Sequence, residues 1–265
     1  HLQRPALFGP CAPDDGLRVV TEQTLPSRGL GAWWQAILVY RQPRMAASLA
    51  LGFSCGLPFM LVGQTLSAWL RQSGIERATI GMLSWVALLY TVKFLWAPVV
   101  DRARLPMLHD LLGRRRSWML LAQGGIVLAV INLSRHDPAA DLAAIVAGAI
   151  LIAFCSATQD IAVDAWRVES APPDEQGAMA AAYQLGYRAA VMAGTAGAFW
   201  IADEQGWHAS YLAMAALACI GIVATLLARE PLPLAGSEAP AQGSLFDAVV
   251  RPLTDFFTRN GLLLG

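Results

Sequence analysis

The sequence predicts an all-α membrane protein built around a bundle of six transmembrane helices. Of its 265 residues, 56% are hydrophobic and only 14% are charged, and the mean hydropathy is +0.47. Soluble domains carry nearer to about a quarter charged residues. The apolar residues also fall in long blocks separated by short polar stretches, which is the pattern of a polytopic membrane protein.

Composition argues against several other classes of protein. The formal net charge is zero, whereas a nucleic-acid-binding protein needs a basic surface. The four cysteines form no CxxC or Cys/His spacing, so we expect neither a metal nor another cofactor. No zinc-binding His/Glu spacing, Ser–His–Asp set or GxSxG motif lies in or near the apolar blocks. We therefore do not expect a membrane-embedded enzyme, and we keep it only as a remote alternative.

The predicted spans follow from segment length. A helix needs about 20 apolar residues to cross the roughly 30 Å hydrocarbon core, where every backbone polar group must be paired within the segment. Six stretches qualify, at about 45–70, 78–100, 117–135, 141–163, 178–201 and 208–228. We expect a cytoplasmic tail over 1–40, the six-span bundle over 41–228 and a cytoplasmic linker over 229–259. Residues 260–265 would begin a seventh span, so we interpret the chain as a fragment.

Arginine placement predicts the orientation. The tail, the 101–116 and 164–177 loops and the linker would share one side, and near the spans they hold ten arginines, against three in the opposite loops. The ten are Arg41, Arg44, Arg102, Arg104, Arg114, Arg115, Arg116, Arg167, Arg229 and Arg251. Because basic loops stay in the cytoplasm, both the tail and the linker are expected there.

Few ionisable residues lie inside the predicted spans, where they are costly and count as candidate functional residues. Lys93, the only lysine, lies in span 2, and Asp160 lies at a similar depth in span 4. Lys93 could be held by Asp160, by a substrate anion, or by each in turn. A static ion pair or a lysine reaching the cytoplasmic surface explains its position equally well. Asp164 and Arg167 share the helical face of Asp160, and a helix-end pair is the favoured interpretation of these two.

Span 5 carries the motif "YQLGYR", in which Tyr183 and Tyr187 are four residues apart, as are Gln184 and Arg188. Each pair therefore shares a helical face. Arg188 lies near mid-bilayer, too far from either surface to reach water easily, and a guanidinium suits carboxylates. We interpret Arg188 as a candidate anion-binding residue.

Six motifs occur in order from about residue 36 onward. They are "GFSCGLP" (52–58), "KFLWAPVVDR" (93–102), "GRRRSW" (113–118), "FCSATQDIAVDAW" (154–166), "LGYR" (185–188) and "PLTDFFTRN" (252–260). Together they resemble AmpG-type muropeptide permeases, a branch of the major facilitator superfamily. The superfamily's general loop motif has a glycine where this chain has Ala97, and a tighter spacing between Asp101 and Gly113.

The resemblance implies a proton-linked permease of the bacterial inner membrane that imports N-acetylglucosamine–anhydro-N-acetylmuramyl peptides by alternating access. Such permeases have at least twelve spans in two bundles, so this chain would supply the N-terminal bundle and need a second, C-terminal one.

The resemblance also implies roles for particular residues. Arg188 and Lys93 would bind substrate carboxylates, with Tyr183, Tyr187 and Gln184 beside them, and Asp160 and Asp164 are the proton-coupling candidates. Asp101 would interlock with the missing bundle as a cytoplasmic gate, supported by Arg102, Arg114, Arg115 and Arg116.

Two other functions remain open beside muropeptide import. Other substrates, such as acetyl-CoA or a sugar, would suit another permease of the same superfamily. A non-transporting membrane scaffold is disfavoured, because charges inside three separate helices serve no purpose in it.

Overall fold

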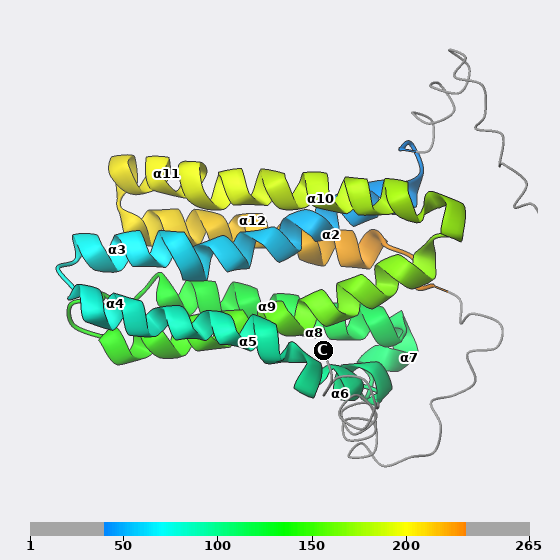
Figure 1. Ribbon diagram of the computed structural model, residues 1–265, viewed down its shortest axis with the longest axis horizontal. Helices are drawn as coiled ribbons and strands as arrows, with labels where there is room; N and C mark the ends of the chain where they lie inside the picture. Colours follow the sequence, from blue (N-terminus) through cyan, green and yellow to red (C-terminus); the bar gives the residue numbers. More distant parts are fainter. Residues whose placement is uncertain (1–39, 232–265) are drawn as a thin grey trace, which may run out of the picture. The chain divides into compact units, whose positions relative to one another are not determined.

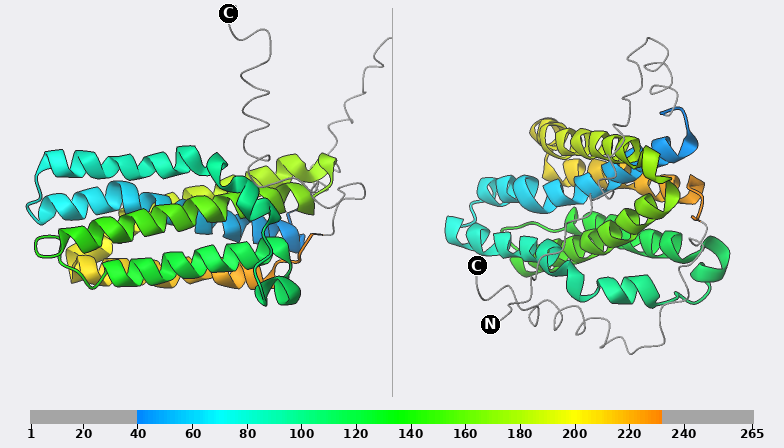
Figure 2. Two further views of the ribbon diagram at one scale, coloured as in Figure 1. Left: turned by 90° about the horizontal axis from the view of Figure 1, so that it is seen from below. Right: turned by 45° about the vertical axis from the view of Figure 1, so that its right-hand side comes forward.

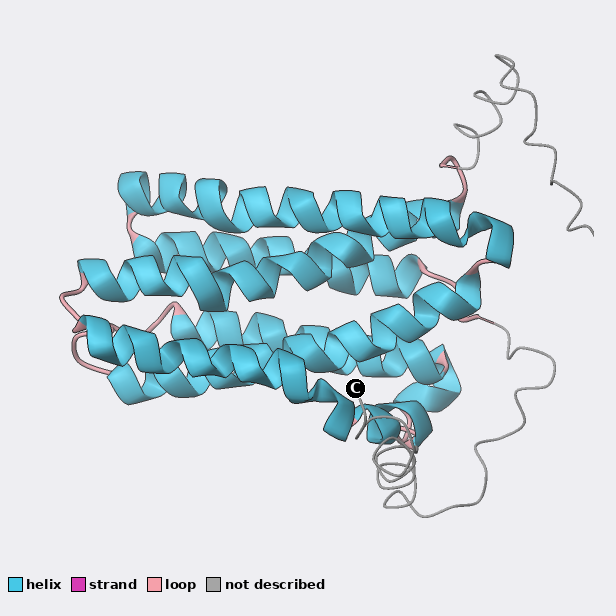
Figure 3. Ribbon diagram, viewed as in Figure 1, coloured by secondary structure: helices cyan, strands magenta, loops and turns pink. Residues whose placement is uncertain are grey.

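The computed structural model describes residues 40–231, which include all six predicted spans. This part of the chain is helical and contains no strand (Figure 3). The predicted tail up to residue 39, the linker beyond residue 231 and the start of a seventh span lie outside the described residues.

Six long helical runs correspond to the six predicted spans. They are α2 (Pro43–Met60), η1 (Leu61–Thr65) and α3 (Leu66–Gln72); α4 (Arg77–Leu83), η2 (Ser84–Ala87), α5 (Leu88–Val92), η3 (Lys93–Leu95) and α6 (Ala97–Arg102); α8 (Arg114–Leu133); α9 (Leu142–Ser170); α10 (Gln176–Met192), η5 (Ala193–Gly197) and α11 (Ala198–Gln205); and α12 (Trp207–Leu227). Two short helices, α7 (Leu108–Leu112) and η4 (Pro173–Glu175), lie in the connections.

Five of these runs are long and apolar enough to cross a membrane: Pro43–Gln72, Arg77–Leu95, Arg114–Leu133, Leu142–Ser170 and Trp207–Leu227. The run over 176–205, which corresponds to the predicted span 178–201, is not among them. Its polar residues Gln184 and Arg188 lower its hydropathy, although it lies along α2 for much of its length.

The first run packs against three of the others. α2 contacts α10, α12 and α9, while α8 packs on α9 and on α12 (Figures 1 and 2). One buried cluster includes Trp69, Ile126 and Tyr211, and a second includes Met45, Trp166 and Met179. The Tyr211 hydroxyl donates to the carbonyl of Leu61 at 2.9 Å, so the π-helical turn of η1 has a side-chain partner.

The contact between α2 and α10 depends on glycine. A Cβ on Gly186 would collide with the carbonyl of Leu49, and a Cβ on Gly52 with the carbonyl of Tyr183. The two backbones therefore touch directly, as small residues at four-residue spacing allow. This approach places Tyr183 and Tyr187 against α2.

The second run departs from the prediction of one continuous helix over 78–100. It is divided into short α and 3₁₀ pieces, and helical hydrogen bonding is interrupted at Trp96. Pro98 explains the break, because proline has no N–H and its ring clashes with the carbonyl four residues earlier, at Phe94. The indole of Trp96 donates to Thr158 Oγ1 on α9 at 3.1 Å, which fixes the broken segment against α9.

Two predicted loops are shorter than expected. α9 continues to Ser170, so the predicted 164–177 loop is helical over its first half. The 101–116 loop contains the end of α6, the whole of α7 and the start of α8. Length explains both differences: a helix needs about 20 residues to cross the membrane but is free to continue beyond it. Asp164 and Arg167 are consequently helical residues.

Candidate functional site

The only lysine, on η3, and the partly buried Asp160, on α9, form an ion pair. Lys93 Nζ lies 3.7 Å from Asp160 Oδ2, and their side chains are 32% and 19% exposed. Lys93 occupies the first position of η3, three residues before the break at Trp96. Asp160 lies two residues after Thr158, which accepts a hydrogen bond from Trp96. The proline-induced break therefore fixes the place of the cation beside the carboxylate.

Several buried polar atoms surround this ion pair. Asp160 Oδ1, Tyr90 Oη and Ser156 Oγ are all buried and have no hydrogen-bond partner among the described residues. Gln159, next to Asp160, donates from Nε2 to Ser54 Oγ at 2.9 Å and to Cys55 Sγ at 3.2 Å. Unpaired buried polar atoms are costly, so a cluster of them marks a site at which a ligand or water could bind.

The two tyrosines of the "YQLGYR" motif lie on α10, which packs against α2. Their ring centroids are 6.4 Å apart, and both side chains are half-buried. The guanidinium of Arg167 lies 5.0 Å from the centre of the Tyr183 ring and also donates to Asp164 Oδ1 at 3.4 Å. The predicted pair of Asp164 and Arg167 is therefore present, and it connects the end of α9 to α10.

Arg188 and Gln184 are exposed on α10. Within residues 40–231 neither side chain forms a hydrogen bond or an ion pair, and no such contact joins Arg188 to Lys93 or Asp160. Lys93 and Asp160 thus form an ion pair, whereas Arg188 lies on a different helix and is available to another group.

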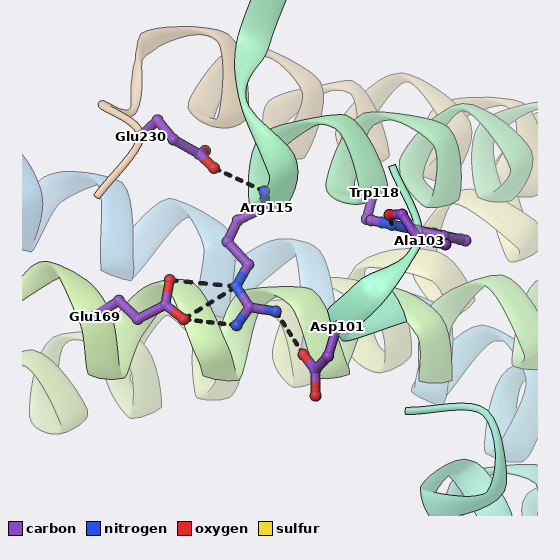
Figure 4. Close-up of polar contacts among 6 residues, drawn as sticks. All are labelled: Asp101, Ala103, Arg115, Trp118, Glu169 and Glu230. Carbon is purple, nitrogen blue, oxygen red and sulfur yellow. Dashed lines mark hydrogen bonds and ion pairs between the residues drawn. The ribbon is translucent and has the colours of Figure 1, made fainter. Parts of the chain in front are cut away.

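The predicted gate is organised around Arg115, whose side chain is only 8% exposed. Its Nη1 lies 2.5 Å from Asp101 Oδ1 on α6, and its Nη2 lies 2.6 Å from Glu169 Oε1 on α9. Arg115 Nε also donates to both carboxylate oxygens of Glu169. Figure 4 shows the guanidinium held between the two acids, so one arginine joins three helical runs.

A third carboxylate, that of Glu230, connects two helices at the same end of the bundle. Glu230, which follows α12, accepts hydrogen bonds from the backbone N–H groups of Arg115 at 2.8 Å and Arg116 at 3.2 Å. These are unpaired donors of the first turn of α8, where a negative charge is favoured. The guanidinium of Arg116 donates in return to the carbonyls of Thr225 and Leu226. The start of α8 and the end of α12 are thus joined twice, through the carboxylate of Glu230 and through the guanidinium of Arg116.

The comparisons with known proteins decide the family. Residues 31–265 match the family model described as Major Facilitator Superfamily. The chain belongs to the Major Facilitator Superfamily. This is the superfamily that the motifs indicated.

Two similar proteins extend the comparison. The chain is 42% identical over 231 residues to the anhydromuropeptide permease of Escherichia coli strain K12. The aligned region covers 87% of this chain and 45% of the permease. The chain is 30% identical over 224 residues to a transporter designated AmpG 4 from Rickettsia felis, covering 83% of this chain and 54% of that protein. Both relatives are named as a permease or a transporter, not as enzymes. The chain spans about half the length of these curated relatives.

The sequence predicted the charged residues of this site but not the neutral polar residues beside them. It placed Lys93 near Asp160, but it missed Tyr90 and Ser156. Those two residues are three and four positions before Lys93 and Asp160, so helical spacing could have identified them.

At the predicted gate, Asp101 is paired with Arg115, and its contact with a second bundle, which lies outside the described residues, stays a prediction. Glu169 and Glu230 were missed, because one was placed in a loop and the other in a linker. Arg116 is bonded to the end of α12, and Arg102 and Arg114 lie half-buried at the same end.

Proposed function

We propose that the complete protein is a proton-coupled permease that carries anhydro-muropeptides across the bacterial inner membrane. The observation that carries this proposal is the 42% identity to an anhydromuropeptide permease over 87% of the chain. The partly buried pair of Lys93 and Asp160 supports it, because charges within spans serve ion and substrate pathways.

The pair offers a way to link proton and substrate binding. Without substrate, the ammonium of Lys93 neutralises the carboxylate of Asp160. A substrate carboxylate that binds Lys93 would take this cation away, and a buried carboxylate without a cation is held at lower cost as the neutral acid. Binding one anionic substrate would therefore promote uptake of one proton at Asp160, which keeps the charge in the site constant.

The other site residues would bind the remaining parts of the substrate. Arg188, exposed on α10 and without an ion-pair partner among residues 40–231, is available to a second carboxylate. Tyr183, Tyr187 and Gln184 would contact the sugars. Asp164, already paired with Arg167, would act on coupling only through its charge near Asp160.

The gate would lie on the cytoplasmic side, where ten of the arginines near span ends are gathered. Asp101, Arg115 and Glu169 would hold α6, α8 and α9 together at this end, with Arg102, Arg114 and Arg116 around them. In this orientation the N-terminus would also lie in the cytoplasm.

A second six-helix bundle would complete the transporter, since alternating access needs two halves that move against each other. Within Arg77–Leu95, Val86 is the only residue that is buried in the described bundle. Trp85 and Met82 on this run are 73% and 66% exposed. We infer that the second bundle covers part of this surface.

Uptake by cells tests the proposal. Cells that lack their own permease and express the complete gene should accumulate a labelled anhydro-muropeptide, and a protonophore should abolish the accumulation. Excess unlabelled muropeptide should compete, whereas acetyl-CoA or free sugar should not. Absence of uptake by the wild-type protein would overturn the substrate assignment, and uptake that survives the protonophore would overturn proton coupling.

A further inference from the structure

A groove runs along the outside of the bundle where the first half of α2 packs beside the second half of α12. It has a volume of about 640 Å³. Small side chains form its walls, among them Ala46 and Ala50 of α2 and Ala216 and Cys219 of α12. Ala46, Ala216 and Cys219 are exposed, so the groove opens to the surroundings. Both helices belong to apolar runs long enough to cross a membrane, so these surroundings are lipid.

The groove continues into a polar cavity at the gate end of the bundle. This second cavity has a volume of about 550 Å³ and shares Pro43, Ala47 and Leu227 with the groove. Its walls include Arg44 and Arg229 together with Glu169 and Glu230. The two spaces together form one path that is apolar along the span and charged at its end.

One guanidinium of the polar cavity, that of Arg229, has no partner among the described residues. Three carboxylates near it already have partners: Glu169 bonds to Arg115, Glu230 to the start of α8, and Glu175 lies 2.7 Å from Arg44. Arg229 is exposed, and its side chain has no hydrogen bond or ion pair with any of residues 40–231. Its carbonyl accepts the indole N–H of Trp166 at 2.9 Å, which holds the backbone in place.

The length of the groove matches half of a membrane. Its α12 wall extends from Ala216 to Leu227, which is about 16 Å at 1.5 Å per residue. The hydrocarbon core is roughly 30 Å thick, so one leaflet accounts for about this distance. An acyl chain lying in the groove would reach from mid-membrane to the surface and place its headgroup beside Arg229.

We propose that this groove binds one acyl chain of an anionic phospholipid, whose phosphate pairs with Arg229. Charge complementarity decides the lipid class. A zwitterionic headgroup carries its own ammonium beside the phosphate, whereas an anionic headgroup leaves a net negative charge for the unpaired guanidinium. Anionic lipids also gather in the cytoplasmic leaflet, where the arginine distribution places this end of the bundle. The proposal needs only the membrane location of the bundle and does not depend on the substrate.

Lipid titration of the complete, delipidated protein tests the proposal by native mass spectrometry. Phosphatidylglycerol should be retained more strongly than phosphatidylethanolamine. Arg229→Gln should weaken phosphatidylglycerol retention about fivefold, the effect of one basic residue at a membrane surface, and should abolish the preference. Arg135→Gln, which removes an exposed arginine at the other end of α8, should change nothing.

Filling the groove gives an independent test. Ala216→Phe or Ala46→Phe should reduce retention of both lipids, while Ala181→Phe, on an exposed face of α10, should reduce neither. Inorganic phosphate at the lipid concentration should not displace bound phosphatidylglycerol, because phosphate alone lacks the chain. The proposal is wrong if Arg229→Gln keeps the wild-type preference, or if both filling variants retain lipid normally. It is equally wrong if the wild type binds no lipid there because another part of the chain or a second copy fills the groove.

Discussion

The backbone N–H of Arg115 donates to Glu230 Oε1 at 2.8 Å. Glu230, three residues beyond the end of α12, therefore caps the N-terminus of α8. The side chain of the same arginine bonds to Asp101 and Glu169. One residue therefore joins α6, α9 and the end of α12 through separate groups. We therefore expect this end of the bundle, the predicted gate, to be sensitive to single substitutions.

Removing the capping charge should weaken this end of the bundle. Glu230→Gln keeps a hydrogen-bond acceptor for the N–H groups of α8 but loses the charge that the helix N-terminus favours. We expect the free energy of unfolding of the complete protein to fall by about 0.5–1 kcal/mol. Thermal unfolding in detergent measures the change. Glu204→Gln, an exposed carboxylate near the end of α11, is the matched control and should leave stability unaltered.

Removing the central guanidinium should cost more. Arg115→Gln leaves Asp101 and Glu169 close together without their cation, and we expect a loss of about 1–3 kcal/mol in the free energy of unfolding. Arg115→Lys should rescue only part of this loss, because an ammonium cannot bond to both acids with the fork of a guanidinium. Arg114→Gln is the control, since Arg114 forms no hydrogen bond or ion pair among residues 40–231. Equal effects of Arg114→Gln and Arg115→Gln would contradict the account of the gate.

The contact between α2 and α10 predicts a marked difference between two glycines of one helix. Gly186→Ala would drive a methyl group into the carbonyl of Leu49, whereas a methyl group at Gly177 would meet no atom within 4 Å. Overpacking of this kind costs about 1–3 kcal/mol. Thermal unfolding should therefore detect Gly186→Ala and not Gly177→Ala. If both variants were as stable as the wild type, α2 and α10 would be farther apart than the structure has them.

The sequence predicted the helical runs and the closeness of Lys93 and Asp160, because span length and depth in the membrane depend on local composition. Spacing along α9 likewise predicted the pair of Asp164 and Arg167, found at 3.4 Å. The partners of Arg115 could not be predicted in this way. Glu169 is 54 residues away from it and Glu230 is 115, and no periodicity relates residues on different helices.

The break at Trp96 was predictable in principle but was missed. Pro98 was visible in the sequence, yet the apolar run on either side indicated a single span. The break places Lys93 on a 3₁₀ turn, and the fixed position of that turn depends on the bond between Trp96 and Thr158 of another helix. Local sequence could thus indicate a kink, but only the packed structure gives its direction.

The stability of single and double variants should show whether Lys93 and Asp160 stabilise the protein by interacting with each other. Lys93→Gln and Asp160→Asn each leave one partly buried charge without its partner, which is destabilising. We expect the double variant to recover much of the loss, because neither charge then remains. Expression level and thermal unfolding of the three variants measure this. A double variant as unstable as the worse single one would show that the charges do not act on each other.

Transport by the same variants tests the central claim most directly. We would measure accumulation of labelled anhydro-muropeptide in cells that express wild type, Lys93→Gln, Asp160→Asn or the double variant, with and without a protonophore. If the pair couples proton and substrate, the double variant should fold and reach the membrane, yet accumulate no more substrate than protonophore-treated wild-type cells. Protonophore-sensitive accumulation by the double variant at the wild-type level would contradict the claim and leave the pair a purely structural contact.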